Sequence, residues 1–342
     1  MSGLPTAEIG RTGLEVTRLG LGTAPLGDLF ILVGDDEAQA VLQAAFDDGV
    51  TLVDTAPQYG LGLSEHRVGR FVRQVDRDSV VVATKVGRLL TPVPRGRERE
   101  DTFWAGGLRF DTRFDYGYDG VMRSFEDSLQ RLGLDRVDML AIHDLDAKHF
   151  AGDAFERRIR ALADGGARAL EELRSSGALS AIGLGINALG SIPRVLDVVD
   201  LDYAIVAMPY TLLDQEALDV ELPLCLERGV SVVIGAVFAS GVLAVDEGSG
   251  TYGYESAPAD VVSKVAAMRE VCERHGVSLA AAALRFPLGH PAVAAVIPGA
   301  LTADQVRENV ARFSVEIPSE VWVELKAEGL LRSDAPVPAV AS

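Results

Sequence analysis

The chain has 342 residues and a formal net charge of −18 at pH 7. Such a surface repels nucleic acid and anionic membranes, so we expect a small-molecule partner. The polar start and the strand-length apolar runs predict neither a signal peptide nor a membrane span. Cys225 and Cys272 lie in apolar helical patterns, which fits reduced thiols and a cytoplasmic protein. No linker-like segment divides the chain, so we expect residues 1–342 to form a single domain.

A β-hairpin is expected first, because residues 7–9 and 14–16 flank the turn-forming residues 10–13. Strand and helix patterns then alternate along the chain. The expected strands begin near Leu19 and at Thr51, Val80, Val137, Ser180, Tyr203, Val230 and Ala292. The expected helices span 36–48, 64–75, 120–132, 165–176, 191–199, 213–228, 257–275 and 279–286. Eight such units predict an α/β fold, a closed (β/α)₈ TIM barrel with an N-terminal β-hairpin.

Two segments are too long to be ordinary connections between a strand and a helix. Segment 87–119 is rich in aromatic residues, including Trp104 and Phe114. Because long ordered loops are often functional, we expect it to form a wall of the substrate pocket; the alternative is a loop that only packs on the barrel rim. Segment 145–164 is charged and is expected to lie outside the site.

Polar side chains follow three successive expected strands. Asp54 ends one strand, with Tyr59 on the turn after it, and Lys85 and His143 end the next two. In a parallel barrel these strand ends meet at one rim. Each residue alone has a structural alternative, such as a cap or a packed side chain, but the repeated placement favours a catalytic site.

The four side chains fit one proton transfer. A tyrosine is a weak acid or base near neutral pH unless its anion is stabilised. Lys85 can lower the pKa of Tyr59, and Asp54 can keep Lys85 charged. His143 can hydrogen-bond the reacting oxygen. Because no side chain supplies or accepts a hydride, a nicotinamide cofactor is implied.

In this strand order, Asp54, Tyr59, Lys85 and His143 resemble the tetrad of the aldo-keto reductases. The resemblance covers about residues 7–309 and implies a (β/α)₈ barrel, no metal, an extended nicotinamide cofactor and Tyr59 as the acid/base. The segments that reinforce it are 19–23, 64–65, 83–85, 128–133 and 297–299.

Three further runs, 54–65, 142–146 and 210–213, are similar to one branch of that family. They resemble the aldose 1-dehydrogenases acting on L-fucose, L-galactose and D-threo-aldoses, and also the NAD-dependent pyridoxal 4-dehydrogenases. Both groups oxidise a ring hemiacetal to a lactone. The resemblance therefore implies NAD-dependent oxidation of such a sugar, or alternatively of pyridoxal to 4-pyridoxolactone, with Tyr59 as the base.

The resemblance also implies where the cofactor lies. Ala207 falls where ordinary carbonyl reductases carry a glutamine, which leaves Asn187 to hold the carboxamide, and Phe238 is expected near the nicotinamide unless it is a core residue. The expected cofactor contacts are Gly22, Thr23, Asp54, Asn187, Phe238, Ala239, Ser240, Gly241, Leu243, Ile297, Gly299, Ala300, Gln305, Glu308 and Asn309. The expected substrate contacts are Tyr59, His143, Trp104 and Phe114.

The turn after Ile297 predicts NAD rather than NADP. NADP-preferring members place lysine or arginine there, whereas this chain has Leu301 and Gln305, with Asp304 and Glu308 close by. A 2′-phosphate beside those carboxylates would be unfavourable.

Three other functions remain open at this point. The same residues could serve an NADPH-dependent reductase of aldehydes or ketones, or a nucleotide-binding redox sensor. A metal-dependent hydrolase could use His143 and Asp144, but no second histidine cluster follows a strand. The pattern Gly20-x-Gly22 lacks the context of a Rossmann fingerprint.

Overall fold

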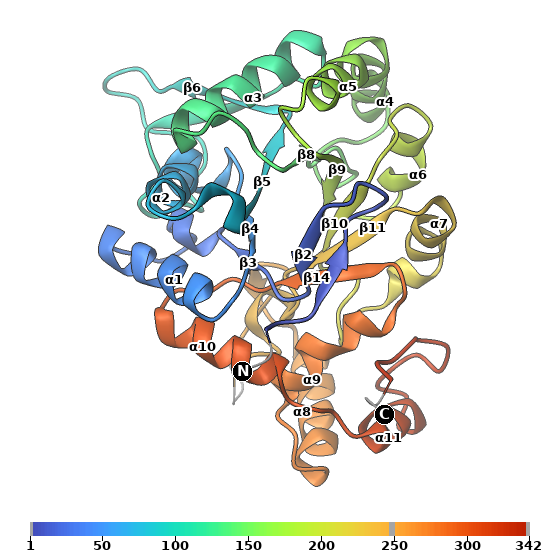
Figure 1. Ribbon diagram of the computed structural model, residues 1–342. Helices are drawn as coiled ribbons and strands as arrows, with labels where there is room; N and C mark the ends of the chain where they lie inside the picture. The colour runs from blue at the N-terminus through green and yellow to red at the C-terminus, as the bar shows by residue number, and fades with distance from the viewer. Residues whose placement is uncertain (1–2, 246–249, 340–342) are drawn as a thin grey trace.

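Eight parallel strands form a closed barrel in the computed structural model, which describes residues 3–245 and 250–339 (Figure 1). The strands are β3 (Leu21–Gly22), β4 (Leu52–Asp54), β5 (Val81–Val86), β8 (Met139–His143), β9 (Ala181–Ile186), β10 (Tyr203–Ala207), β11 (Ser231–Gly235) and β14 (Val293–Ile297). They pair in this order, and the bridges Leu19–Val296 and Gly22–Gly299 join β14 back to β3. The predicted (β/α)₈ barrel is confirmed, and each strand begins within two residues of its expected start.

The barrel strands are buried on both faces, as their nearly continuous apolar sequences require. One alternation of side chains fills the barrel interior, including Met139, Ala181 and Tyr203. The expected N-terminal hairpin is also present, with β1 (Thr6–Glu8) paired to β2 (Glu15–Thr17). Ile9 and Val16 from the hairpin pack into the same interior cluster, so the hairpin closes one end of the barrel (Figure 1).

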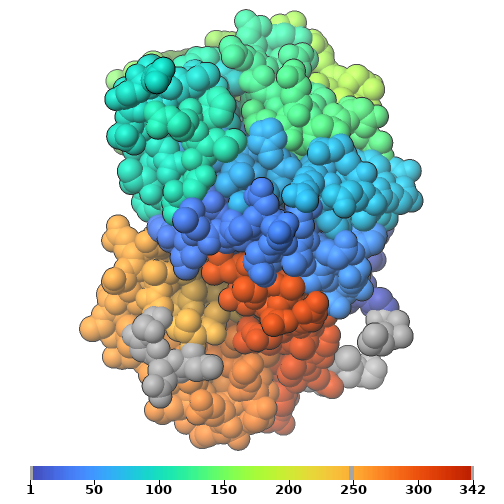
Figure 2. All heavy atoms as spheres, turned by 90° about the vertical axis from the view of Figure 1, so that its left-hand side faces the viewer, coloured from blue at the N-terminus to red at the C-terminus, as the bar shows by residue number. Residues whose placement is uncertain are grey.

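Helices surround the ring of strands (Figure 1), because apolar stripes on the helices and the outer faces of the strands share one hydrophobic core. Helix α1 packs against α10, and the two lie side by side on the surface in Figure 2. None of the helices in the described part of the chain is long and apolar enough to cross a membrane. The helices are α1 (Asp35–Asp47), α2 (Leu63–Val72), α3 (Tyr118–Leu132), α4 (Asp153–Ala161), α5 (Ala167–Ser175), α6 (Ser191–Leu196), α7 (Glu221–Arg228), α8 (Ala259–Arg274), α9 (Leu279–Arg285), α10 (Ala303–Phe313) and α11 (Ser319–Ala327).

One expected helix is wrong in its first half. The prediction of a helix over 213–228 holds only for α7, which begins at Glu221. Pro223 lies in the first turn of α7, where a missing amide proton costs no helical hydrogen bond; in the middle of a longer helix it would break one. The preceding residues form a loop with one short 3₁₀ helix, Glu216–Leu218, and in this loop Gln215 Nε2 donates to the carbonyls of Thr211 and Leu212 at 3.1 and 2.8 Å.

Two hairpins extend beyond the barrel strands. Segment 87–119 contains β6 (Arg88–Pro92) and β7 (Phe110–Phe114), which pair antiparallel. A shorter hairpin pairs β12 (Thr251–Tyr252) with β13 (Glu255–Ser256). Figure 2 shows β6 and β7 (teal) and the segment of β12 and β13 (gold to orange) on the same side of the molecule. Both hairpins follow the carboxyl ends of barrel strands, where (β/α)₈ enzymes build their sites.

A glycine inside the barrel gives the first testable prediction. Gly183 on β9 is the register partner of Tyr203 on β10, and a Cβ at Gly183 would lie 2.4 Å from the tyrosine ring. Because Tyr203 is fully buried and cannot move aside, Gly183→Ala should lower the free energy of unfolding by about 1–3 kcal/mol. Gly235→Ala is the matched control, since its Cβ would meet ordinary contacts at 3.5 Å. Urea unfolding compares the two; equal stabilities would contradict the prediction.

Candidate active site

The strands bring Asp54 and Lys85 into direct contact at the barrel mouth. Lys85 Nζ lies 2.8 Å from both carboxylate oxygens of Asp54 and also donates to the carbonyl oxygen of Thr55 at 2.8 Å. Both side chains are buried, with 4% or less of each exposed. Burial raises the pKa of Asp54, and the charge and hydrogen bonds of Lys85 oppose this shift.

Tyr59 lies beside this pair because the turn after β4 reverses sharply. Gly60 has φ +63°, and a Cβ there would lie 2.6 Å from the carbonyl oxygen of Gly27, so only glycine fits. Lys85 Nζ lies 4.7 Å from the centroid of the Tyr59 ring. The ring of His143 is 6.0 Å away and nearly perpendicular. The structure therefore brings the four predicted side chains together.

The pKa of Tyr59 is shifted opposite to the expectation. Burial raises the pKa of this phenol well above its usual value, and the charges of Asp54, Tyr254 and Asp144 raise it further. The expected lowering of the Tyr59 pKa by Lys85 is wrong for this structure, because burial dominates and Lys85 is hydrogen-bonded to Asp54, whose negative charge acts in the opposite direction. Arg88, rather than Lys85, opposes the upward shift.

His143 is neutral in this environment. Burial lowers its pKa well below the usual value, although the charge of Asp144 opposes this shift. Its Nε2 atom lies 3.3 Å from Asp144 Oδ2, and its Nδ1 atom is buried without a hydrogen-bond partner in the described part of the chain. The hydroxyl of Tyr116 donates to the carbonyl oxygen of His143 at 2.8 Å and so fixes the end of β8.

An ion pair that the sequence analysis missed lies next to His143. Arg88 Nη2 is 2.6 Å from Asp144 Oδ2, and more than 90% of each side chain is buried. Arg88 Nη1 also donates to Gln58 Oε1 at 3.2 Å, and Asn187 Nδ2 donates to Asp144 Oδ1 at 3.0 Å. The sequence held one signal: Asp144 directly follows β8, and Arg88 comes two residues after the end of β5, the strand that carries Lys85.

The expectation that segment 145–164 lies outside the site is wrong for its first residues. His149 Nε2 lies 3.1 Å from Arg88 Nη2, and His149 Nδ1 lies 2.9 Å from Asp146 Oδ1. Asp146 also accepts the backbone amide of Asn187 at 2.7 Å. Asp144, Asp146 and His149 are close enough together to suggest a metal site. The guanidinium group of Arg88, which bonds to Asp144 and His149, already supplies the positive charge there.

Of the two aromatic side chains expected to contact the substrate, Trp104 lies near Tyr59 and Phe114 does not. The ring of Trp104 lies 5.8 Å from that of Tyr59, as expected for a wall of the mouth. Asp101 holds Trp104 in place through the indole Nε1, at 3.2 Å. Phe114 instead lies behind Arg88, with its ring 4.4 Å from the guanidinium carbon and 4.7 Å from the ring of Phe150. Among the predicted aromatic contacts, Trp104 is therefore the one beside Tyr59.

Tyr254 is a further residue at the mouth that the sequence analysis did not single out. It lies in the turn between β12 and β13, with φ +72°, and its amide donates to Ser240 Oγ at 3.2 Å. Lys148 Nζ lies 5.3 Å from its ring centroid. The charge of Tyr254 is one of those that raise the pKa of Tyr59. No periodicity in this glycine-rich stretch points to a site.

The expected cofactor contacts lie at the carboxyl ends of β3, β4, β9, β11 and β14 and on α10. Asn187 fits a carboxamide, because its Nδ2 is used by Asp144 while its Oδ1 accepts no recorded hydrogen bond among the described residues. Ala239 and Ser240 have φ of +50° and +67°, so the loop after β11 turns sharply at the residues expected to contact the cofactor. Thr23 and Leu243 are fully buried, and the Thr23 hydroxyl donates to the carbonyl oxygen of Asp54.

The residues expected at the far end of the cofactor surround the start of α10. Gln305 Oε1 accepts the amide of Leu301 at 2.8 Å. Arg307 pairs with Asp304 at 2.7 Å, and Arg312 pairs with Glu308 at 3.1 Å.

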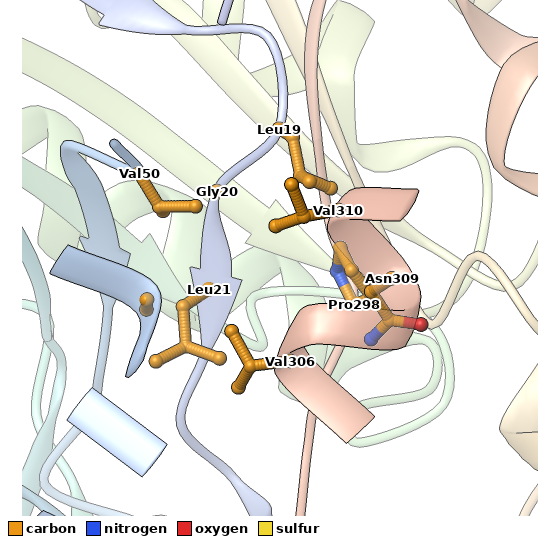
Figure 3. A pocket seen from close by; sticks show the side chains of 9 residues that line it. Leu19, Gly20, Leu21, Val50, Pro298, Val306, Asn309 and Val310 are labelled. Atoms are coloured by element: carbon orange, nitrogen blue, oxygen red, sulfur yellow. The ribbon is translucent and has the colours of Figure 1, made fainter. Parts of the chain in front are cut away.

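A small crevice lies outside the barrel between β3, α1 and α10 (Figure 3). Leu21 and Val306 line it, and Asn309 lies beside Pro298 at one side. With a cavity volume of about 10 Å³ it has room for at most one water molecule. It is therefore a packing gap between elements and not the place where a substrate would bind.

Known proteins similar to this chain agree with its fold and identify its family. The Aldo/keto reductase family model matches residues 18–328. Pyridoxal 4-dehydrogenase of Microbacterium luteolum is 43% identical, covering 94% of this chain and 97% of that protein. D-threo-aldose 1-dehydrogenase of a Pseudomonas species is 39% identical, covering 93% of this chain and 96% of that protein. The solved holo structure of an aldo-keto reductase from Bacillus halodurans superposes with a TM-score of 0.74 at 24% identity, covering 99% of this chain and 98% of that chain. At this identity the similarity supports the fold alone.

Proposed function

The chain belongs to the aldo/keto reductase family, and we propose that it is an NAD-dependent dehydrogenase that oxidises a cyclic hemiacetal to its lactone. The observation that carries the proposal is the arrangement of Tyr59, Lys85 and His143 at the barrel mouth. The oxidative direction is supported by relatives named as dehydrogenases at 39–43% identity. Members of the family use nicotinamide cofactors, and the nicotinamide is the group that accepts hydride when bound.

The residues of the chain handle the proton. Tyr59 accepts the proton of the anomeric hydroxyl as hydride leaves the same carbon, with neutral His143 as hydrogen-bond partner of that oxygen. Because the pKa of Tyr59 is raised, its basic form becomes more abundant as pH rises. We therefore expect oxidation to be faster at mildly alkaline pH than at neutral pH. Asn187 holds the carboxamide through its Oδ1, which accepts no hydrogen bond from the residues that the structure describes.

Two kinds of hemiacetal are candidate substrates. The first is a sugar of the L-fucose, L-galactose or D-threo-aldose type, in line with the aldose dehydrogenase relative. The second is pyridoxal, whose flat pyridine ring could stack on Trp104, 5.8 Å from the ring of Tyr59. The relative that is 43% identical is a pyridoxal 4-dehydrogenase, which also favours this candidate.

NAD is the proposed cofactor. Arg307 and Arg312, the two arginines of α10, are each paired with a carboxylate of the same helix. Neither cation is free to neutralise a 2′-phosphate, and the nearby carboxylates would repel one. The two buried, free cysteines are compatible with a reducing compartment, and we propose the cytoplasm as the location.

Initial rates of NADH or NADPH formation test the proposal, with NAD or NADP and with L-fucose, L-galactose, D-arabinose or pyridoxal as substrate. We expect turnover on at least one substrate, with kcat/KM for NAD about tenfold or more above that for NADP, a difference of about 1.4 kcal/mol. If none of the four substrates is oxidised and the enzyme instead reduces simple aldehydes with NADPH, the chain is an ordinary reductase. Nucleotide binding without any turnover would favour a redox sensor.

A further inference from the structure

A single guanidinium group connects the two halves of the barrel mouth. Arg88 binds Asp144 through Nε and Nη2, at 3.0 and 2.6 Å, on the side of His143. On the other side, its Nη1 binds Gln58, the residue before Tyr59, at 3.2 Å. Its planar fork thus spans from the turn of Tyr59 to the end of β8. A lysine could not make these bonds simultaneously.

Asp144 uses both carboxylate oxygens in this array. Its Oδ2 accepts from Arg88 and lies 3.3 Å from His143 Nε2, while its Oδ1 accepts from Asn187. Its backbone has φ +54°, which is unfavourable for a side-chain-bearing residue and persists only where surrounding contacts enforce it. The Asp144 carboxylate thus lies close enough to His143 for its negative charge to act on the imidazole, and this charge opposes the downward shift of the His143 pKa that burial causes.

We propose that the buried Arg88–Asp144 ion pair is a positioning element of the reaction centre, which holds Tyr59, His143 and Asn187 in one array and sets the pH dependence of the reaction. The inference rests on the proposed function, since those three residues are the ones assigned to the proton and to the carboxamide. The pair itself touches neither reacting atom; it acts through Gln58, His143 and Asn187.

The two members of the pair act on Tyr59 with opposite sign. The negative charge of Asp144 raises the pKa of Tyr59, and the positive charge of Arg88 lowers it. Removing Asp144 should therefore make the basic form of Tyr59 available at lower pH, and removing Arg88 should have the opposite effect. Among the described residues, the other titratable groups that face Tyr59, His143 or Asp144 are Asp54 and Lys85 on the strands, Tyr116 before α3, Asp146 and His149 after β8, and Tyr254 between β12 and β13.

Three variants test the inference through kcat/KM measured against pH. Asp144→Asn should move the rising limb of the oxidation profile to lower pH, and Arg88→Gln should move it to higher pH. Both should lower kcat by about 10²-fold, the loss expected when a reacting group shifts by about 1 Å. Arg88→Lys keeps the charge but loses the fork, so it should lower kcat while leaving the limb near its wild-type position. The affinity for NAD, followed by fluorescence quenching, should stay within about threefold in Asp144→Asn, because asparagine can still accept from Asn187.

A matched pair stands at the opposite end of β8. Arg77 Nη2 lies 2.8 Å from Asp138 Oδ2, and both side chains are largely buried. Arg77→Gln and Asp138→Asn should lower the free energy of unfolding as the mouth variants do. They should leave kcat within about twofold of wild type and the pH profile unchanged, because neither charge is among those that shift the pKa of Tyr59.

The outcomes separate the inference from the proposed function. The inference is overturned if Asp144→Asn and Arg88→Gln fold and are active but do not shift the rising limb of the pH profile in opposite directions. The Arg88–Asp144 pair would then have a structural role only. If the wild-type enzyme oxidises no hemiacetal but reduces aldehydes, the proposed function fails. The same opposite shifts can then be measured on the falling alkaline limb of reduction, and their presence would still support the pair's role.

Discussion

Tyr59→Phe should lose about 10³-fold or more in kcat for hemiacetal oxidation while its affinity for NAD changes by less than about twofold. The phenol is the group placed to accept the substrate proton, beside His143 and over Lys85, and phenylalanine keeps the ring contacts with Trp104. Steady-state kinetics and quenching of protein fluorescence by NAD measure the two effects separately.

Tyr252→Phe is the control for this variant. The hydroxyl of Tyr252 donates to Asp214 Oδ1 at 3.0 Å, away from the four predicted residues, so its loss should leave kcat within about twofold. A Tyr59→Phe enzyme with more than a tenth of wild-type activity would refute the assignment of Tyr59 as the base.

Lys85→Met should abolish turnover and also destabilise the protein by about 3–5 kcal/mol at neutral pH. The substitution leaves the carboxylate of Asp54 buried and without its cation. Burial then raises the pKa of Asp54 without opposition, so folding takes up a proton. A group whose pKa is raised in the folded state contributes stability at low pH that is lost as pH rises. The loss in free energy of unfolding relative to wild type, measured with urea, should therefore be larger at pH 8 than at pH 5.

The double variant Lys85→Met/Asp54→Asn separates charge from packing. It removes the unpaired carboxylate, so it should recover part of the lost stability at pH 8 but none of the activity, since the cation near Tyr59 is still missing. Equal stability of the single variant at pH 5 and pH 8 would mean that Asp54 is not the buried charge responsible.

The sequence by itself was sufficient to predict the barrel and to identify the four candidate catalytic residues at its mouth. Parallel strands buried on both faces must be nearly continuous apolar runs, and their carboxyl ends must meet at one rim. Asp54, Lys85 and His143 were recognisable because each ends such a run, and Gly60 marked the turn that carries Tyr59. These properties depend on local periodicity and on a topology that permits few alternatives.

Only the tertiary structure decided the surroundings of these residues. The Arg88–Asp144 pair joins residues 56 positions apart, and Tyr254 and His149 reach the mouth from loops with no periodic pattern. The direction of the Tyr59 pKa shift was wrong in the sequence analysis for the same reason. It depends on burial and on which partner takes each hydrogen bond of Lys85, and both are set by distances between loops that no local pattern encodes.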